Sequence, residues 1–150
     1  MNAYADTSFL LSLYGRDANS PRAAALVARD KPSFFVTEFG EVEFNNAVER
    51  LLFSRHGQAR WTQNEARAVR DRFDLYSNAG VVQLRPVPNQ TWQMAVQLSR
   101  QYTAKLGTRT LDVLHVAIAL SLRPDVFFTF DKRQWKLAKA VGLRVLPARP

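Results

Sequence analysis

The chain has 150 residues, 47% of them hydrophobic, and contains no cysteine. This length and apolar content predict one compact domain with a buried core, and the lack of cysteine excludes disulfides, thiolate-bound metals and a cysteine nucleophile. Lysine and arginine outnumber aspartate and glutamate by 21 to 13, and the net charge of +8 favours polyanionic partners.

The first residues do not resemble a secretion signal. The segment Met1–Asp6 has no basic leader and places a carboxylate just before the apolar run. The longest apolar stretch, Val113–Leu122, is interrupted by His115 and is much shorter than the roughly 20 residues that cross a bilayer. We therefore expect a cytoplasmic protein without a membrane segment.

Alternating apolar patterns predict strands and helices in turn along the chain. A strand over residues 3–5 leads to a helix, for which Thr7 and Ser8 offer capping hydroxyls. A strand over 33–36 leads to a long helix capped by Thr37, and a helix through Ala66–Tyr76 ends before Gly80 and a strand over 81–84.

The second half of the chain continues this alternation. A helix through Trp92–Leu106 stops at Gly107, and the next helix, over 111–122, is apolar nearly all round, which predicts an interior position. A strand over 126–130, a helix through Trp135–Val141 and a strand over 143–146 complete the chain. We expect Trp92 and Trp135 in the core rather than stacked on nucleic-acid bases. The whole pattern predicts a single domain over 1–150 with a parallel sheet covered on both sides.

Two aspartates directly follow predicted strands. Asp6 comes after the first strand and Asp131 after the apolar strand that ends at Phe130. Functional groups collect at the carboxyl ends of strands in open parallel sheets, so both side chains are candidates for one site. Either aspartate alone could simply cap the helix that follows it.

Asp112 is a carboxylate in an otherwise apolar helix, where it would be costly to bury without a partner. Its place in the first turn leaves open that it only caps that end, where the helix dipole favours an anion. His115 lies three residues further on, and could orient Asp112 or form a hydrogen bond within the core. We expect a supporting role for His115.

The helix that begins at Thr37 carries several glutamates, and helical spacing separates them. Glu41, Asn45 and Glu49 lie on one polar ridge, which indicates exposure to solvent. Glu43 borders the apolar stripe and points toward the protein. The same pattern also permits an acid at the edge of the stripe with its carboxylate in water.

Four converging carboxylates would repel one another, so the cluster predicts a bound cation. Oxygen ligands select hard ions such as Mg²⁺ or Mn²⁺. Zinc is less suited, because the histidines, His56 and His115, have no ligand spacing. Such a cation acidifies a bound water and stabilises charge on a phosphodiester, so hydrolysis needs no protein nucleophile.

Four ordered motifs cover the chain nearly from end to end. They are Ala5-Asp6-Thr7-Ser8, Glu43-Phe44-Asn45-Asn46-Ala47, Leu111-Asp112-Val113-Leu114-His115-Val116-Ala117 and Phe128-Thr129-Phe130-Asp131-Lys132-Arg133. Together they resemble the motifs of the VapC-type toxins of the PIN-domain ribonuclease family. The resemblance implies a PIN-like three-layer α/β/α sandwich with a central parallel sheet. It also implies an endoribonuclease that uses Mg²⁺ or Mn²⁺ at Asp6, Glu43, Asp112 and Asp131, with Ser8 and Thr129 in support. A cognate VapB-type antitoxin and a homodimer are further implications.

A basic tail adjoins these acids. From Lys132 onward the chain has six basic residues and no acidic one. Lys132, Arg133 and Lys136 are therefore candidate contacts for RNA phosphates.

Other functions share some of these features. A non-catalytic PIN module that binds nucleic acid or protein would keep the acids without turnover. A metal-dependent phosphatase for small esters needs the cation but not the basic tail. A DNA nuclease also fits, because nothing in the sequence visibly reads a 2′-hydroxyl.

Overall fold

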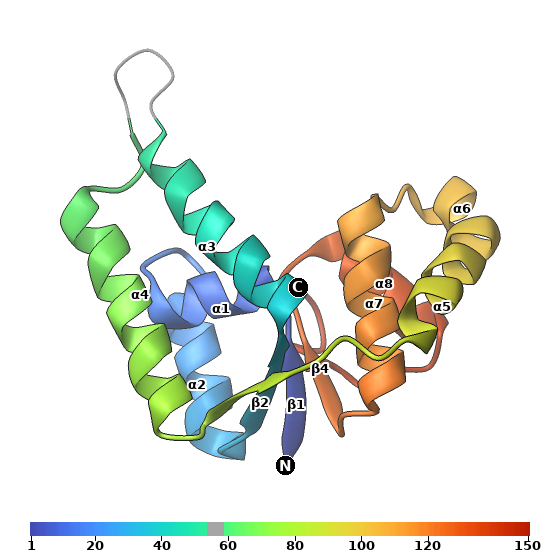
Figure 1. Cartoon of the computed structure of the whole chain (residues 1–150), viewed down its shortest axis with the longest axis horizontal. Helices are drawn as coiled ribbons and strands as arrows, with labels where there is room; N and C mark the ends of the chain where they lie inside the picture. The colour runs from blue at the N-terminus through green and yellow to red at the C-terminus, as the bar shows by residue number, and fades with distance from the viewer. Residues whose placement is uncertain (54–58) are drawn as a thin grey trace.

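A parallel sheet lies at the centre of the structure, a computed structural model that describes residues 1–53 and 59–150. Its strands are β1 (Asn2–Ala5), β2 (Ser33–Thr37), β3 (Val82–Arg85), β4 (Val126–Phe128) and β5 (Val145–Leu146). They pair in the order β3-β2-β1-β4-β5, and every neighbouring pair is parallel (Figure 1). The prediction of a parallel α/β sheet is confirmed.

Helices cover both faces of this sheet (Figure 1). One face is covered by α1 (Thr7–Tyr14), α2 (Ser20–Asp30), α3 (Glu38–Leu52) and α4 (Gln63–Asn78). The other face is covered by α5 (Gln90–Leu98), a π-helical turn η1 (Ser99–Thr103), α6 (Ala104–Leu106), α7 (Thr110–Leu122) and α8 (Lys132–Ala140). The predicted three-layer α/β/α sandwich is therefore present.

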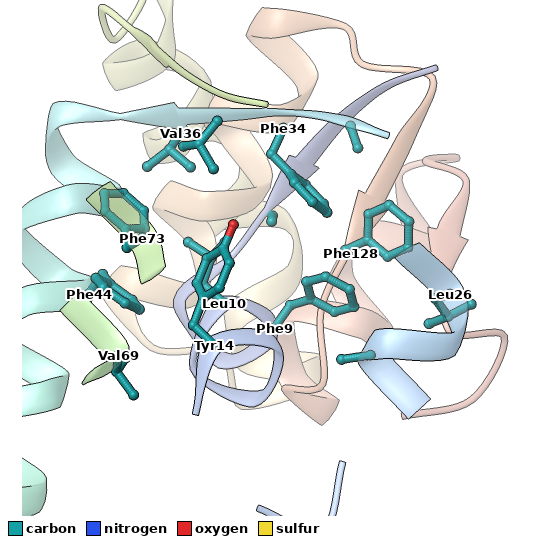
Figure 2. Packing of buried hydrophobic residues seen from close by; sticks show 14 of the residues in the cluster. Phe9, Leu10, Tyr14, Leu26, Phe34, Val36, Phe44, Val69, Phe73 and Phe128 are labelled. Carbon is teal, nitrogen blue, oxygen red and sulfur yellow. The ribbon is translucent and has the colours of Figure 1, made fainter. Parts of the chain in front are cut away.

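The alternation of side chains along the strands gives each face its own core. Phe34 and Phe128 point to the face of α1, where Phe9 packs against both of them, as Figure 2 shows. Tyr4 and Phe127 point to the opposite face and pack against the helices there. Successive residues of a strand face opposite ways, so a strand buried on both faces is apolar throughout, as β4 is.

Helix α7 lies in the interior, as its composition predicts. Val116 and Ala117 are fully buried, whereas Leu111 in its first turn is 45% exposed. Across the described residues no helix combines the length and apolar character that a membrane span requires.

The structure corrects several details of the sequence analysis. The helix α2 was not predicted, although Pro21 at its start is a recognised helix-initiation signal. The N-cap of α1 is Asp6, rather than Thr7 or Ser8. Trp92 is 55% exposed, so its predicted core position is wrong.

Trp135 lies where the prediction put it, partly buried against the core of its face. Its indole nitrogen donates a hydrogen bond of 3.1 Å to the carbonyl oxygen of Pro147, which ties α8 to the end of the chain. Strand β4 ends at Phe128, two residues earlier than predicted. Thr129 and Phe130 therefore belong to the loop between β4 and α8, at the carboxyl edge of the sheet.

Candidate active site

The strand order places a topological switch point beside β1. The chain runs outward from β1 to β2 and β3 on one side, and later to β4 and β5 on the other. Strands β1 and β4 are neighbours, with Ala5 paired to Phe128. Open α/β sheets bind ligands at the carboxyl ends of strands where the order reverses. Asp6 and Asp131 follow the two strands that meet there.

Asp6 is fully buried at this edge. Its carboxylate caps α1 by accepting a hydrogen bond of 2.9 Å from the amide of Phe9. The hydroxyls of Ser8 and Thr129 also donate to it, at 2.8 Å and 2.7 Å. Burial raises the pKa of Asp6 to about 6, although the charge of His115 and these hydrogen bonds lower it. Helix capping alone does not require Asp6 to be buried this deeply. Because burial disfavours the ionised carboxylate, a nearby positive charge would stabilise it.

Thr129 connects Asp6 to Asp131. Its hydroxyl donates to Asp6 and accepts a hydrogen bond of 2.9 Å from the amide of Asp131. The Oδ1 atom of Asp131 in turn accepts from the amides of Arg133 and Gln134 at 2.7 Å and 3.1 Å, which makes it the N-cap of α8. Both aspartates therefore cap helices, and the loop after β4 holds the two caps together.

We expect Thr129→Val to lower the free energy of unfolding by about 1–3 kcal/mol, because a similarly shaped side chain leaves a buried carboxylate short of a donor. Urea denaturation followed by circular dichroism measures the change. Thr110→Val is the matched control, since Thr110 is exposed at the start of α7. Equal stability of the two variants would show that Thr129 does not hold Asp6.

Glu43 enters the site from α3. Its Oε2 atom accepts hydrogen bonds from the hydroxyl of Thr7 and, at 2.6 Å, from Nε2 of His115. Burial alone would raise the pKa of Glu43, but its bonds to His115 and Thr7 and the charge of His115 hold it below its ordinary value. The sequence prediction that Glu43 points toward the protein is correct, since its side chain is 19% exposed.

His115 lies between Glu43 and Tyr4. Its Nδ1 atom is 2.8 Å from the hydroxyl of Tyr4, and His115 itself is fully buried. A carboxylate only accepts hydrogen bonds, so Nε2 donates to Glu43, while Nδ1 shares the other hydrogen bond with the hydroxyl of Tyr4. Of the two roles considered for His115, the structure supports a hydrogen bond within the core. His115 supports Glu43, whereas the hydrogen bonds of Asp112 come from other residues.

Asp112 is compensated by Arg133. Asp112 is buried, and its Oδ2 atom accepts from the amide of Arg109 at 2.8 Å and from Nε of Arg133 at 2.9 Å. The same guanidinium is 3.6 Å from Oδ2 of Asp131. A buried carboxylate requires such a partner. Arg133, which the sequence suggested as a phosphate contact, therefore faces the acids, while Lys132 and Lys136 are exposed on α8.

The structure thus links the four acids without making them one ligand set. Thr129 joins Asp6 to Asp131 and Arg133 joins Asp131 to Asp112. Glu43 is connected through Thr7, the neighbour of Asp6. Within 1–53 and 59–150, no three or more His, Asp or Glu residues are placed so as to hold a metal ion. His56 lies outside the described residues.

The chemistry of the donors nevertheless fits a hard cation, because the four acids offer only carboxylate oxygens. The sequence analysis expected a cation to compensate these acids. In the structure the guanidinium of Arg133 lies between Asp112 and Asp131 and supplies positive charge to their carboxylate oxygens. Sequence reasoning missed this ion pair and the contacts of Tyr4 and Thr7. The position of Thr7 next to Asp6 could have indicated that Thr7 lies at the site. The position of Arg133 two residues after Asp131 could have indicated the same for Arg133.

Comparisons with known proteins agree with this architecture. The model of the PIN domain family matches residues 3–140. VapC20 of Mycobacterium tuberculosis, a toxin described as cleaving the sarcin-ricin loop, is 19% identical and aligns over 99% of both chains with a TM-score of 0.68. FitAcB of Neisseria gonorrhoeae is 15% identical over 95% of both chains, with a TM-score of 0.65. VapBC-1 of nontypeable Haemophilus influenzae is 16% identical over 97% of this chain and 96% of that chain, with a TM-score of 0.64. No curated protein matched the sequence.

Proposed function

The chain belongs to the PIN domain family, and from that premise we propose that it is a VapC-type toxin, an endoribonuclease that hydrolyses RNA with a carboxylate-bound divalent metal. The observation that carries this proposal is the chain of contacts that joins Asp6, Asp131 and Asp112 at the switch point of the sheet. Asp6 and Asp131 follow strands at the edge where parallel sheets bind ligands, and Glu43 is connected to this edge through Thr7.

We propose Asp6, Glu43, Asp112 and Asp131 as the residues that would hold Mg²⁺ or Mn²⁺. When bound, such a cation lowers the pKa of a water ligand and stabilises charge on a phosphodiester. The chain itself supplies orientation. Ser8 and Thr129 hold Asp6 through hydroxyl hydrogen bonds, and His115, fixed by Tyr4, holds Glu43.

RNA is the proposed substrate because the chain carries a net charge of +8 and part of this charge lies beside the acids. Lys132 is the first residue of α8, directly after Asp131, and Lys136 lies one turn further on. Both are exposed and can contact phosphates. Arg133 can also contact a phosphate, but only when its guanidinium no longer pairs with Asp112 and Asp131.

A cognate VapB-type antitoxin is the proposed partner. This proposal is supported by the likeness of the fold to FitAcB and VapBC-1, and by a further structure described as VapBC2 from Rickettsia felis bound to a DNA fragment from its promoter. Homodimer formation and a cytoplasmic location stay predictions from the sequence.

We expect the purified protein to cut RNA in the presence of Mg²⁺ or Mn²⁺, and to stop when a chelator removes the cation, because no protein nucleophile is proposed. Gel analysis of a labelled RNA with and without EDTA measures this, and excess Mn²⁺ should restore the cleavage. Cleavage that persists in EDTA would contradict the metal-dependent mechanism.

Parallel assays with other substrates distinguish the remaining candidate functions. Cleavage of a matched DNA strand but not of RNA would indicate a DNA nuclease, and release of phosphate from a small ester alone would indicate a phosphatase. Binding of RNA without cleavage would indicate a non-catalytic PIN module. The pairing of Arg133 with Asp112 and Asp131 is the observation that favours this last alternative.

A further inference from the structure

The guanidinium of Arg133 occupies the space between two of the proposed metal ligands. Its Nε atom is 2.9 Å from Oδ2 of Asp112, and its terminal nitrogen is 3.6 Å from Oδ2 of Asp131. Asp112 comes from the first turn of α7 and Asp131 caps α8, so the two acids reach the arginine from different elements. One side chain thus contributes positive charge to both carboxylates.

The burial of the partners differs, and this difference determines which of them can leave. The side chain of Asp112 is 7% exposed, whereas that of Arg133 is 36% exposed. An arginine at the boundary with solvent can move its charge into water at modest cost, because its long side chain is flexible. The buried carboxylate of Asp112 cannot reach water in this way, and leaving its charge without a cationic partner is costly. When Arg133 leaves, Asp112 therefore needs another cation.

We propose that Arg133 is an internal counter-ion that competes with a divalent cation for Asp112 and Asp131, so that cation binding and release of the guanidinium are one exchange. This inference rests on the proposed function, since it takes these acids as ligands of the cation. The hydrogen bonds that remain to the two acids come from backbone amides: Arg109 donates to Asp112, and Arg133 and Gln134 donate to Asp131. These amides hold the carboxylates in position while their cationic partner changes.

The exchange has a consequence for the substrate. Arg133 lies in the first turn of α8, between the exposed Lys132 and the buried Gln134. Released from the acids, its guanidinium joins the basic surface that Lys132 begins, where it can bind a phosphate in a bidentate manner. The protein therefore presents its full basic surface only when the cation is bound.

Binding of Mn²⁺ to the protein alone tests the exchange, with electron paramagnetic resonance as the measure of free Mn²⁺. Two linked equilibria weaken each other by the same factor. We expect Arg133→Ala to bind Mn²⁺ about fivefold more tightly than the control, the lower end of typical couplings because Arg133 is partly exposed. Lys139→Ala is the control. It removes the same charge from α8, and Lys139 contacts the ring of Trp135, 6.0 Å away, rather than an acid.

Two further variants keep the test valid if Arg133→Ala does not fold. Arg133→Gln keeps much of the side-chain length without the charge and should also bind Mn²⁺ more tightly than Lys139→Ala. Arg133→Lys keeps the charge but loses the fork of donors, and its affinity should lie between those of wild type and Arg133→Gln. Circular dichroism of each variant confirms that it is folded.

A second readout follows the arginine itself. In the wild-type protein the Nε–H resonance of Arg133, assigned by its loss in Arg133→Lys, should shift and exchange faster with water as Mg²⁺ is added. An Nε–H resonance that stays unchanged at saturating Mg²⁺ would overturn the exchange.

The Mn²⁺ affinities of these variants distinguish a failure of the proposed exchange from a failure of the proposed metal site. Asp112→Asn should weaken Mn²⁺ binding if Asp112 is a ligand. If it does so while Arg133→Ala, Arg133→Gln and Lys139→Ala bind equally, the exchange is wrong and the metal site stands. If Asp112→Asn binds Mn²⁺ as tightly as wild type, or wild type and Arg133→Ala bind none, both proposals are wrong.

Discussion

Asp112→Asn should abolish RNA cleavage while leaving the fold in place. Asparagine has nearly the same shape as aspartate, and its carbonyl oxygen can still accept the hydrogen bond from the amide of Arg109. What it loses is the negative charge that a divalent cation needs. Removal of one electrostatic contributor from an active site costs about 10²-fold or more in rate, and we expect the loss here to be at least that large.

The fold should tolerate this change because of where the remaining charge lies. When one partner of a buried ion pair is removed, the cost is about 3–5 kcal/mol if the other charge stays buried. Here the other charge is Arg133, which is 36% exposed and can turn into solvent. The free energy of unfolding should therefore change by much less than that range.

Single-turnover cleavage of a labelled RNA, together with a thermal melt of each protein, measures both parts of this prediction. Asp71→Asn is the matched control, because it removes the same charge from an exposed position on α4, away from the site. If Asp112→Asn and Asp71→Asn cut RNA at the same rate, Asp112 has no role in catalysis and the proposed site is wrong.

Phe9→Ala should cause the largest loss of stability, about 3–5 kcal/mol, which is typical of deleting a buried aromatic ring. Phe9 is fully buried. Its ring centroid lies 4.6 Å from that of Phe128 and 5.9 Å from that of Phe34, both labelled in Figure 2. The ring centroid of Phe130 lies 5.4 Å away. Three elements lose contacts at once, since these rings come from β2, β4 and the loop that precedes α8.

The loss should also be measurable against a residue of the same type. Phe53→Ala is the control, because Phe53 is 68% exposed and surface substitutions change stability by about 0.5 kcal/mol or less. Urea unfolding curves of the two variants give the difference directly. Similar curves would mean that the cluster around Phe9 contributes little to the stability of the sheet and α1.

Local pattern predicted most of the fold, for reasons that particular elements illustrate. The uninterrupted apolar run at Val126–Phe128 indicated a strand buried on both faces, and the apolar helix over 111–122 indicated an interior position. Both predictions are correct because burial on all sides leaves little freedom in composition. The candidate acids were identified the same way, from their places after strands or within apolar helix faces.

The helices on the surface were less predictable. In α2 the buried residues are Ala23 and Leu26, and the sequence analysis missed this helix. In α5, Trp92 was expected in the core but is exposed, while Ala95 and Leu98 are buried. Which side of a helix is covered depends on the neighbour that packs against it, and the apolar period of the helix does not name that neighbour.

The sequence by itself determined the class of most elements, the apolar layers and the choice of the four candidate acids, because these depend on spacing within a few residues. Tertiary structure alone decided the partners of those acids. Thr129 reaches Asp6 across 123 residues, His115 reaches Glu43 across 72, and Arg133 reaches Asp112 across 21. Such contacts follow from the order in which the strands are laid side by side, and so does the burial that raises the pKa of Asp6.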